Sequence, residues 1–161
     1  MNTLVVIQAR LASTRLPGKI NMLISGKSML THVYERACRI GPTHIADARH
    51  YPEIPEQYVL ARFAAVAERY PLVDTFVRLT ADCPMLDVGL ARDMLREFET
   101  RNNDAGLEPC DIMSTSPRLD GLDVQIFTRE ALREAVIHAK SSHDREHVTT
   151  WMLMVGRLHT V

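Results

Sequence analysis

Three cationic side chains lie close together near the N-terminus of the sequence. Residues 7–19 read Ile-Gln-Ala-Arg-Leu-Ala-Ser-Thr-Arg-Leu-Pro-Gly-Lys, so that Arg10, Arg15 and Lys19 fall within ten residues. Guanidinium groups offer forked donors, an ammonium offers a point charge, and the Ser-Thr pair between them adds hydroxyl and backbone donors. These groups together suit a polyphosphate. A solvated basic loop is the alternative, because short clusters of Arg and Lys are common on protein surfaces.

The position of this loop supports the first interpretation. The loop follows the apolar run 4–7, which predicts a buried strand, and precedes a predicted helix. Open α/β sheets bind their ligands at the carboxyl ends of their strands. Asp82 follows a second predicted strand and lies at the same edge of the sheet if the two strands are parallel. Mg²⁺ prefers one or two carboxylates together with phosphate oxygens, which makes Asp82 a candidate metal ligand; a turn residue is the other interpretation.

Hydrophobic periodicity along the chain predicts an α/β fold. Strands are predicted over residues 3–8, 74–80, 111–114 and 122–127. Helices are predicted over 27–40, 56–70 and 144–154, and two more begin at the N-caps Asp87 and Thr128. Alternating strands and helices of this kind form three layers around a mainly parallel sheet.

The composition limits the class of protein. With 161 residues, of which 46% are hydrophobic, the chain can bury one core, and we treat 1–161 as a single domain. A net charge of −1 and a pI near 6.6 argue against a general binder of nucleic acid or membranes. Cys38, Cys83 and Cys110 are odd in number and widely spaced, as expected of reduced thiols. Since no apolar run approaches membrane-spanning length, we expect a soluble, cytoplasmic protein.

Several blocks of the sequence match a known family. The segment from Gln8 to Lys19 resembles the opening motif of the cytidylyltransferases that make CMP-activated acidic sugars. The resemblance is closest to the spore-coat-polysaccharide type, with the CMP-Kdo and CMP-acylneuraminate synthetases as relatives. Further blocks follow in the family's order at 59–63, 77–84, 120–127 and 144–149. The resemblance covers most of the chain, and it implies a nucleotidyltransferase domain of the nucleotide-diphospho-sugar transferase type.

The resemblance implies that a sugar hydroxyl attacks the α-phosphorus of CTP and releases pyrophosphate. Nucleotide binding is assigned to Gln8, Ala9, Arg10, Ser13, Thr14, Arg15 and Lys19. Arg10 and Lys19 would also be catalytic, because such reactions depend on positioning and on neutralising charge. Asp82 would hold Mg²⁺, and the sugar would contact Asp123, Gln125 and Arg145.

Asp123 and Gln125 can also be assessed from the pattern alone. Both lie on the predicted strand 122–127 and alternate with apolar residues, so they share one face of the sheet. On a central strand these polar groups would need partners such as sugar hydroxyls. On an edge strand they would simply be solvated.

His143 and His147 have the i, i+4 spacing that can chelate zinc on a helix. The segment offers no third ligand and lacks the glutamate of a zincin motif. We therefore favour the start of a helix, in which Asp144 offsets the helix dipole.

The chain departs from the family pattern in ways that affect function. Residues 41–56 contain three prolines and no apolar run, so we predict a loop where the family has strands, and a sheet with fewer strands. An uncovered sheet edge invites pairing with another chain, which predicts a homodimer. Ala81 replaces a usual glycine, Gln125 replaces a usual acidic residue, and the sequence ends before the family's second metal ligand.

Two hypotheses follow. The first is a compact cytidylyltransferase whose metal site is completed by Asp123, by Asp144 or by a partner chain. The second is a catalytically silent relative that keeps the phosphate loop and serves as a nucleotide-binding or assembly module in polysaccharide biosynthesis.

Overall fold

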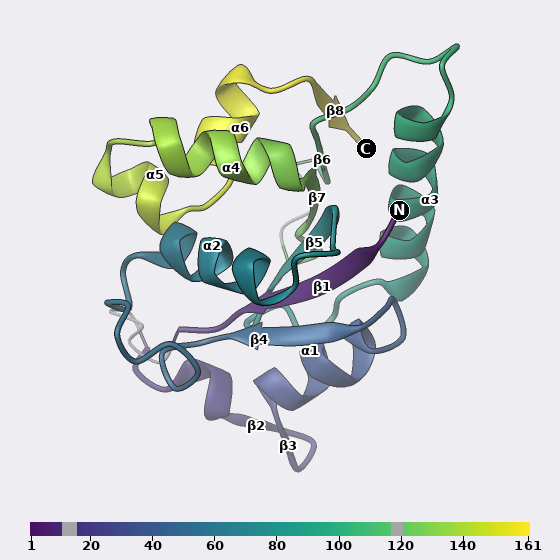
Figure 1. The fold of residues 1–161 in the computed structure, drawn as a ribbon. Coiled ribbons are helices and arrows are strands. Elements are labelled where there is room, and N and C mark those ends of the chain that lie inside the picture. Colours follow the sequence, from purple (N-terminus) through teal and green to yellow (C-terminus); the bar gives the residue numbers. More distant parts are fainter. Residues whose placement is uncertain (11–15, 117–120) are drawn as a thin grey trace.

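A computed structural model describes residues 1–10, 16–116 and 121–161. Its centre is a six-stranded sheet with the order β4-β1-β5-β7-β6-β8 (Figure 1). The strands are β1 (Thr3–Gln8), β4 (Thr43–Ala46), β5 (Thr75–Thr80), β6 (Ile112–Ser114), β7 (Val124–Thr128) and β8 (Leu158–Thr160). β1 is parallel to β4 and β5, β6 is parallel to β8, and β7 is antiparallel to both of its neighbours. The predicted α/β fold with a mainly parallel sheet is confirmed.

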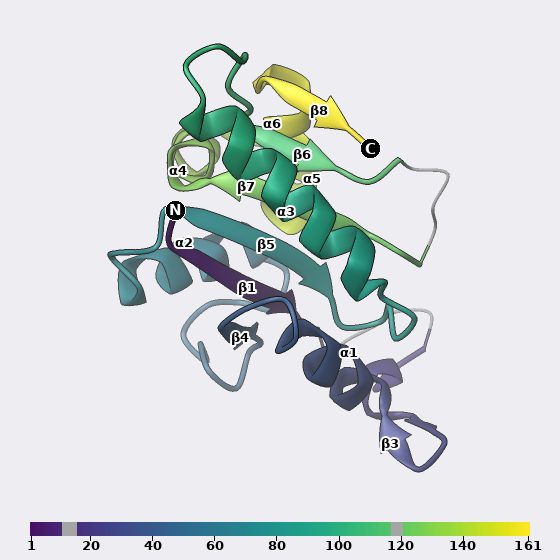
Figure 2. The ribbon, with the colours of Figure 1, turned by 90° about the vertical axis from the view of Figure 1, so that its right-hand side faces the viewer.

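Helices cover both faces of the sheet. They are α1 (Met29–Ala37), α2 (Val59–Arg69), α3 (Val88–Asn103), α4 (Arg129–His138), α5 (Ser142–Glu146) and α6 (Thr150–Val155). Val5 and Ile7 of β1 pack in one buried cluster with α1 and α3, which lie on the near side of the sheet in Figure 2. Leu4 and Val6 point the other way and pack with α2, α4 and α6. Because successive strand residues face opposite sides, one apolar run supplies both cores.

Two of the helices begin at the N-caps that the sequence predicts. The carboxylate of Asp87 accepts hydrogen bonds from the backbone N–H groups of Gly89 and Leu90, at 2.8 and 3.1 Å. The hydroxyl of Thr128 accepts one from the N–H of Ala131 at 3.0 Å. Each cap satisfies donors that the first turn of a helix leaves free, which is worth about 1 kcal/mol.

The prediction of a loop without a strand over residues 41–56 is wrong. Thr43–Ala46 forms β4, which pairs in parallel with β1 from Val5↔Thr43 to Gln8↔Ala46. The segment lacks an apolar run because His44 lies in it, yet His44 is buried and bonded to the hydroxyls of Tyr51 and Tyr70, at 2.9 and 3.3 Å. The argument from a missing strand to a homodimer therefore does not hold, and the homodimer stays a prediction.

Some element boundaries also differ from the prediction. The hairpin β2 (Leu23–Ile24) and β3 (Lys27–Ser28) takes up the first residues of the predicted helix 27–40. Ser28 then caps α1, since its hydroxyl accepts a bond from the N–H of Thr31 at 3.1 Å. The predicted helix 144–154 is divided into α5 and α6, with Val148 between them in the left-handed region at φ 48°.

All three cysteines are free thiols, with Cys38 exposed and Cys83 and Cys110 buried. Among the helices in the described part of the chain, none is both long and apolar enough to cross a membrane.

Candidate functional site

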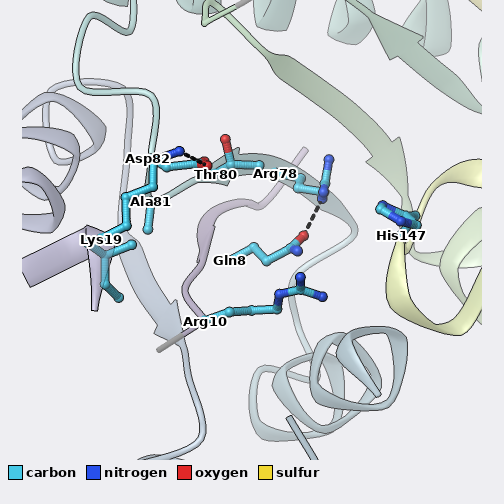
Figure 3. Close-up of a pocket in the computed structure, with 9 residues that line it drawn as sticks. Gln8, Arg10, Lys19, Arg78, Thr80, Ala81, Asp82 and His147 are labelled. Atoms are coloured by element: carbon cyan, nitrogen blue, oxygen red, sulfur yellow. Dashed lines mark hydrogen bonds and ion pairs between the residues drawn. The ribbon is translucent and has the colours of Figure 1, made fainter. Parts of the chain in front are cut away.

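The loop after β1 and the turn after β5 meet at one edge of the sheet. The two strands are parallel neighbours, and Gln8 lies opposite Thr80 at their carboxyl ends. A pocket of about 230 Å³ lies there (Figure 3). Its lining residues are Gln8, Arg10, Lys19, Ile20, Arg78, Thr80, Ala81, Asp82 and His147. The structure thus brings together Gln8, Arg10, Lys19 and Asp82, four of the residues that the sequence marks as site residues.

Lys19 and Asp82 form an ion pair in this pocket, with Nζ of the lysine 2.9 Å from Oδ2 of the aspartate. Gly18 directs the chain into this contact: its φ of 71° is left-handed, which glycine adopts without strain, and a short 3-10 helix (Lys19–Asn21) follows. Partial burial alone would raise the pKa of Asp82, but the Lys19 ammonium outweighs it and holds that pKa below its usual value. Asp82 is therefore ionised at neutral pH.

Arg10 connects the loop after β1 to the C-terminal part of the chain. Its guanidinium forms an ion pair with Glu146 at the end of α5, and both side chains are about one-third exposed. The hydrogen bond from Arg10 lowers the pKa of Glu146. The pair holds α5 beside the pocket and also neutralises part of the Arg10 charge.

The backbone at the base of the pocket is held by bonds that extend the sheet. The N–H of Ala9 donates to the carbonyl of Ala46 at 3.3 Å, and the N–H of Ala81 donates to the carbonyl of Gln8 at 3.0 Å. Both alanines are buried. The chain therefore stays in register for one residue past the strand ends, which fixes where the pocket residues begin.

Arg78 is a pocket residue that the analysis of the sequence does not identify. Its Nε donates to Oε1 of Gln8 at 2.8 Å, and its Nη1 donates to Oε1 of Gln125 on β7. Thr149 donates to the same Gln125 oxygen at 2.9 Å. Burial lowers the pKa of Arg78 to about 10, so the side chain remains charged at neutral pH. The signal in the sequence is a lone cation inside the apolar strand β5, since charged residues are rarely buried without a reason.

His147 is the second pocket residue that the sequence analysis does not place there. It follows α5, and its ring centroid is 4.4 Å from that of His143. Burial, followed by the nearby His143, lowers the pKa of His147, so the ring is neutral at pH 7. Within the described residues no three His, Cys, Asp or Glu side chains are grouped to hold a metal ion, which leaves this histidine pair without a third ligand.

The other predicted site residues have different surroundings. Asp123 adjoins the site without lining the pocket, and its Oδ2 accepts a weak bond from Sγ of Cys83 at 3.5 Å. Arg145 lines a separate hollow beside Tyr58, and its Nε donates to the carbonyl of Ala139 at 3.4 Å. Ser13, Thr14 and Arg15 lie outside the described residues. β7 is a central strand, and Gln125 has Arg78 and Thr149 as partners within the described residues; its contact with a sugar stays a prediction.

Comparison with known proteins agrees with this geometry. The family model described as cytidylyltransferase matches residues 4–46, which include β1, the basic loop and β4. Over these residues the chain is similar to cytidylyltransferases. It is 34% identical over 118 residues to a 3-deoxy-manno-octulosonate cytidylyltransferase of Mesorhizobium japonicum, an alignment that covers 62% of this chain and 49% of that protein. The chain thus spans about half the length of this relative.

Solved structures share the fold across the whole chain. A cytidylyltransferase from Leptospira borgpetersenii aligns with a TM-score of 0.84 and 22% identity, covering 100% of this chain and 76% of that one. A CMP:2-keto-3-deoxy-manno-octonic acid synthetase complexed with CTP aligns with a TM-score of 0.69 and 18% identity, covering 100% and 90%. Rv0371c from Mycobacterium tuberculosis, in complex with manganese, aligns at 0.64 and 13%, covering 100% and 88%. At these identities the likeness shows the fold.

Proposed function

We propose that this chain binds CTP with Mg²⁺ and transfers CMP to the hydroxyl of an acidic sugar, with release of pyrophosphate. The observation that carries the proposal is the Lys19–Asp82 ion pair, which lies in one pocket with Arg10 at the joint carboxyl ends of β1 and β5. A pocket that combines cations for phosphate with an ionised carboxylate for a metal suits a metal–nucleotide complex. The match to 3-deoxy-manno-octulosonate cytidylyltransferases supports the sugar class.

In the proposed reaction the protein supplies position and charge and no covalent nucleophile. Lys19 and Arg10 would bind the β- and γ-phosphates and neutralise the charge that develops on the leaving pyrophosphate. The fixed backbone at the strand ends would hold the α-phosphorus in line with the attacking hydroxyl. Placement of this kind can supply a large part of a rate enhancement in phosphoryl-type transfers.

The donor set of the pocket fits Mg²⁺. Asp82 is ionised and side-chain exposed to 44%, so one of its oxygens can bind a cation when Lys19 turns to a phosphate. Mg²⁺ commonly takes one or two carboxylates and completes its shell with phosphate oxygens and water. When bound, the ion would withdraw charge from the phosphate oxygens that it contacts.

A second candidate function is a silent nucleotide-binding module. It is favoured by one specific observation: Asp82 is the sole carboxylate among the pocket residues of the described chain. A metal held by one protein ligand is positioned loosely, and such a protein could bind nucleotide without efficient transfer.

Calorimetric titration with CTP, ATP and pyrophosphate, each with and without Mg²⁺, tests nucleotide binding. The proposal expects CTP to bind more tightly with Mg²⁺ than without it. A pyrophosphate-release assay with sugar acids then separates the enzyme from the silent module. CTP that fails to bind under either condition would refute both functions.

A further inference from the structure

Arg78 is half-buried and forms no direct ion pair within the described residues, and Asp123 and Asp82 act on its charge only from a longer range. Arg78 lies on β5, which is the strand between β1 and β7 in the sheet. The side chains that bind it, Gln8 and Gln125, are neutral amides. Within the described residues no carboxylate lies within ion-pair distance of its guanidinium. A partly buried charge without a direct ion pair is favoured by an opposite charge or a ligand that reaches it. An arginine held this way beside a pocket is therefore suited to an anionic ligand.

The guanidinium is held firmly by residues of the same sheet face. Arg78 is the direct cross-strand neighbour of Gln125, and Gln8 comes from the adjoining parallel strand. Gln125 is itself fixed by the hydroxyl of Thr149. These bonds use Nε and Nη1, whereas Nη2 donates to no side chain or carbonyl in the described chain. Within the described residues this nitrogen remains available to a ligand, and Arg78 lines the pocket (Figure 3).

The position of Arg78 separates it from the phosphate end of the pocket. Lys19 and Asp82 lie together at one end, past the end of β5, while Arg78 lies toward the other end beside His147 (Figure 3). β5 ends at Thr80, and Arg78 lies two residues before that end. Two residues of an extended strand span roughly 7 Å, so Arg78 is set back by that distance from the end of the strand. The neighbouring groups on that side (Figure 3) are the neutral ring of His147, the amide of Gln125 and the guanidinium of Arg10, which Glu146 already pairs. A second anionic group, distinct from the triphosphate tail, fits here.

We propose that Arg78 binds the carboxylate of the acceptor sugar and thereby makes the site selective for acidic acceptors, a role that rests on the proposed function. A guanidinium offers the planar, forked donors that match a carboxylate. Gln8 and Gln125 orient the guanidinium of Arg78 without neutralising its charge. In this chain a carboxylate at position 125 would compete with the acceptor for Arg78.

Two variants test this role. Arg78→Met removes the cation, and Gln125→Glu keeps the accepting Oε1 for Arg78 and Thr149 while adding a charge that satisfies Arg78 internally. Arg96→Met, which changes an exposed arginine on α3, is the matched control. Calorimetric titrations use 3-deoxy-manno-octulosonate and N-acetylneuraminate, each beside its neutral carboxamide, with CTP titrated separately. Circular dichroism and thermal unfolding establish that each variant is folded.

We expect both test variants to lose about tenfold or more in affinity for the bound acid, since charge-assisted bonds are strong. Affinity for the carboxamide and for CTP should stay within about twofold, and Arg96→Met should bind as the parent does. The role is overturned if the acid binds equally well to the variants, if no acid of the panel binds the parent chain, or if the loss falls on CTP instead, which would assign Arg78 to a phosphate. Failure of CTP to bind the parent chain would count against the proposed function alone, because the acid titrations are read independently.

Discussion

The ammonium of Lys19 lies 2.9 Å from the carboxylate of Asp82, although 63 residues separate the two in the sequence. The contact joins the basic loop after β1 to the turn after β5, and it exists because β1 and β5 are parallel and end together. A cation and a proposed metal ligand in direct contact must exchange partners when a metal–nucleotide complex binds. We therefore expect the affinity of the pocket for phosphate to depend on both residues.

Replacing Lys19 with alanine should weaken the binding of pyrophosphate and CTP. The lysine supplies a charge-assisted bond, so we expect a loss of about 1.5–3 kcal/mol in binding free energy. The same range is expected for Arg15→Ala, which lies outside the described residues. Calorimetry measures the effect, with Lys27→Ala as the control because Lys27 pairs with Glu35 on the surface. Unchanged affinity in both test variants would argue against a phosphate site in this loop.

Replacing Glu146 with glutamine should strengthen the binding of CTP. Glu146 neutralises part of the Arg10 charge, and the amide would release it toward the phosphates. Because both side chains are partly exposed, we expect only about a two- to fivefold gain, which shrinks as salt is added. Titrations at low and high ionic strength measure it. Weaker binding would mean instead that Glu146 is needed to orient Arg10.

The sequence predicts those elements of the fold that are formed by runs of apolar residues. The strand Thr3–Gln8, the caps Asp87 and Thr128, and the meeting of Lys19 with Asp82 follow from periodicity and from the rule that parallel strands end at one edge. β4 does not follow, because its His44 is made compatible with the core by tyrosines that come from later in the chain. A local sequence pattern cannot predict contacts of this kind with residues that come later in the chain.

The same limit applies to the site. Arg78 interrupts an apolar strand, and nothing local says whether such a cation faces solvent, a ligand or a buried partner. Its role becomes visible when Gln8 and Gln125 are brought to either side of it by the strand order β1-β5-β7. Arg145 shows the opposite. Its sequence segment, 144–149, matches the family pattern, but its side chain lines a different hollow from the pocket that Arg78 lines.

Replacing Asp47 with alanine should destabilise the fold. This buried carboxylate follows β4 and accepts bonds from the backbone N–H groups of Arg49 and His50, at 3.1 and 3.0 Å. Leaving those donors unpaired should lower the free energy of unfolding by about 2–3 kcal/mol at pH 7. Urea unfolding measures the loss, and Asp93→Ala, at an exposed position on α3, should change stability by less than about 0.5 kcal/mol.

The contribution of Asp47 should also depend on pH. Burial raises its pKa, but the bonds from Arg49 and His50 outweigh burial and hold the pKa below its usual value. A carboxylate with a lowered folded-state pKa stabilises the protein above its unfolded pKa of about 4, and that stability is lost as the pH falls through the folded pKa. The difference between the parent and Asp47→Ala should therefore narrow between pH 5 and strongly acidic conditions. A constant difference over that range would indicate that the charge of Asp47 does not matter.

Replacing Asp82 with asparagine should abolish the Mg²⁺-dependent part of CTP binding. The amide is a poor ligand for Mg²⁺ and no longer pairs with Lys19, whereas the pair is too exposed to matter much to the fold. The thermal unfolding midpoint should stay close to that of the parent chain. Titrations of CTP with and without Mg²⁺ separate the Mg²⁺-dependent part of the affinity from the part that does not need Mg²⁺. If Mg²⁺ still strengthens CTP binding in this variant, Asp82 is not the metal ligand.

Turnover by the 161-residue chain should be slow even where CTP and Mg²⁺ bind. Asp82 is the one carboxylate that lines the pocket in the described chain, so Mg²⁺ would be held chiefly by the nucleotide's own phosphates. Since catalysis of this transfer depends on placement, a loosely held ion leaves the α-phosphorus and the acceptor hydroxyl poorly aligned. We expect pyrophosphate release with sugar acids to be close to the rate without acceptor. Fast release would mean that a second carboxylate reaches the metal, and Asp123 is the first to test, because it already contacts Cys83 beside Asp82. In that case Asp123→Asn should reduce the rate at saturating CTP while leaving CTP affinity nearly unchanged.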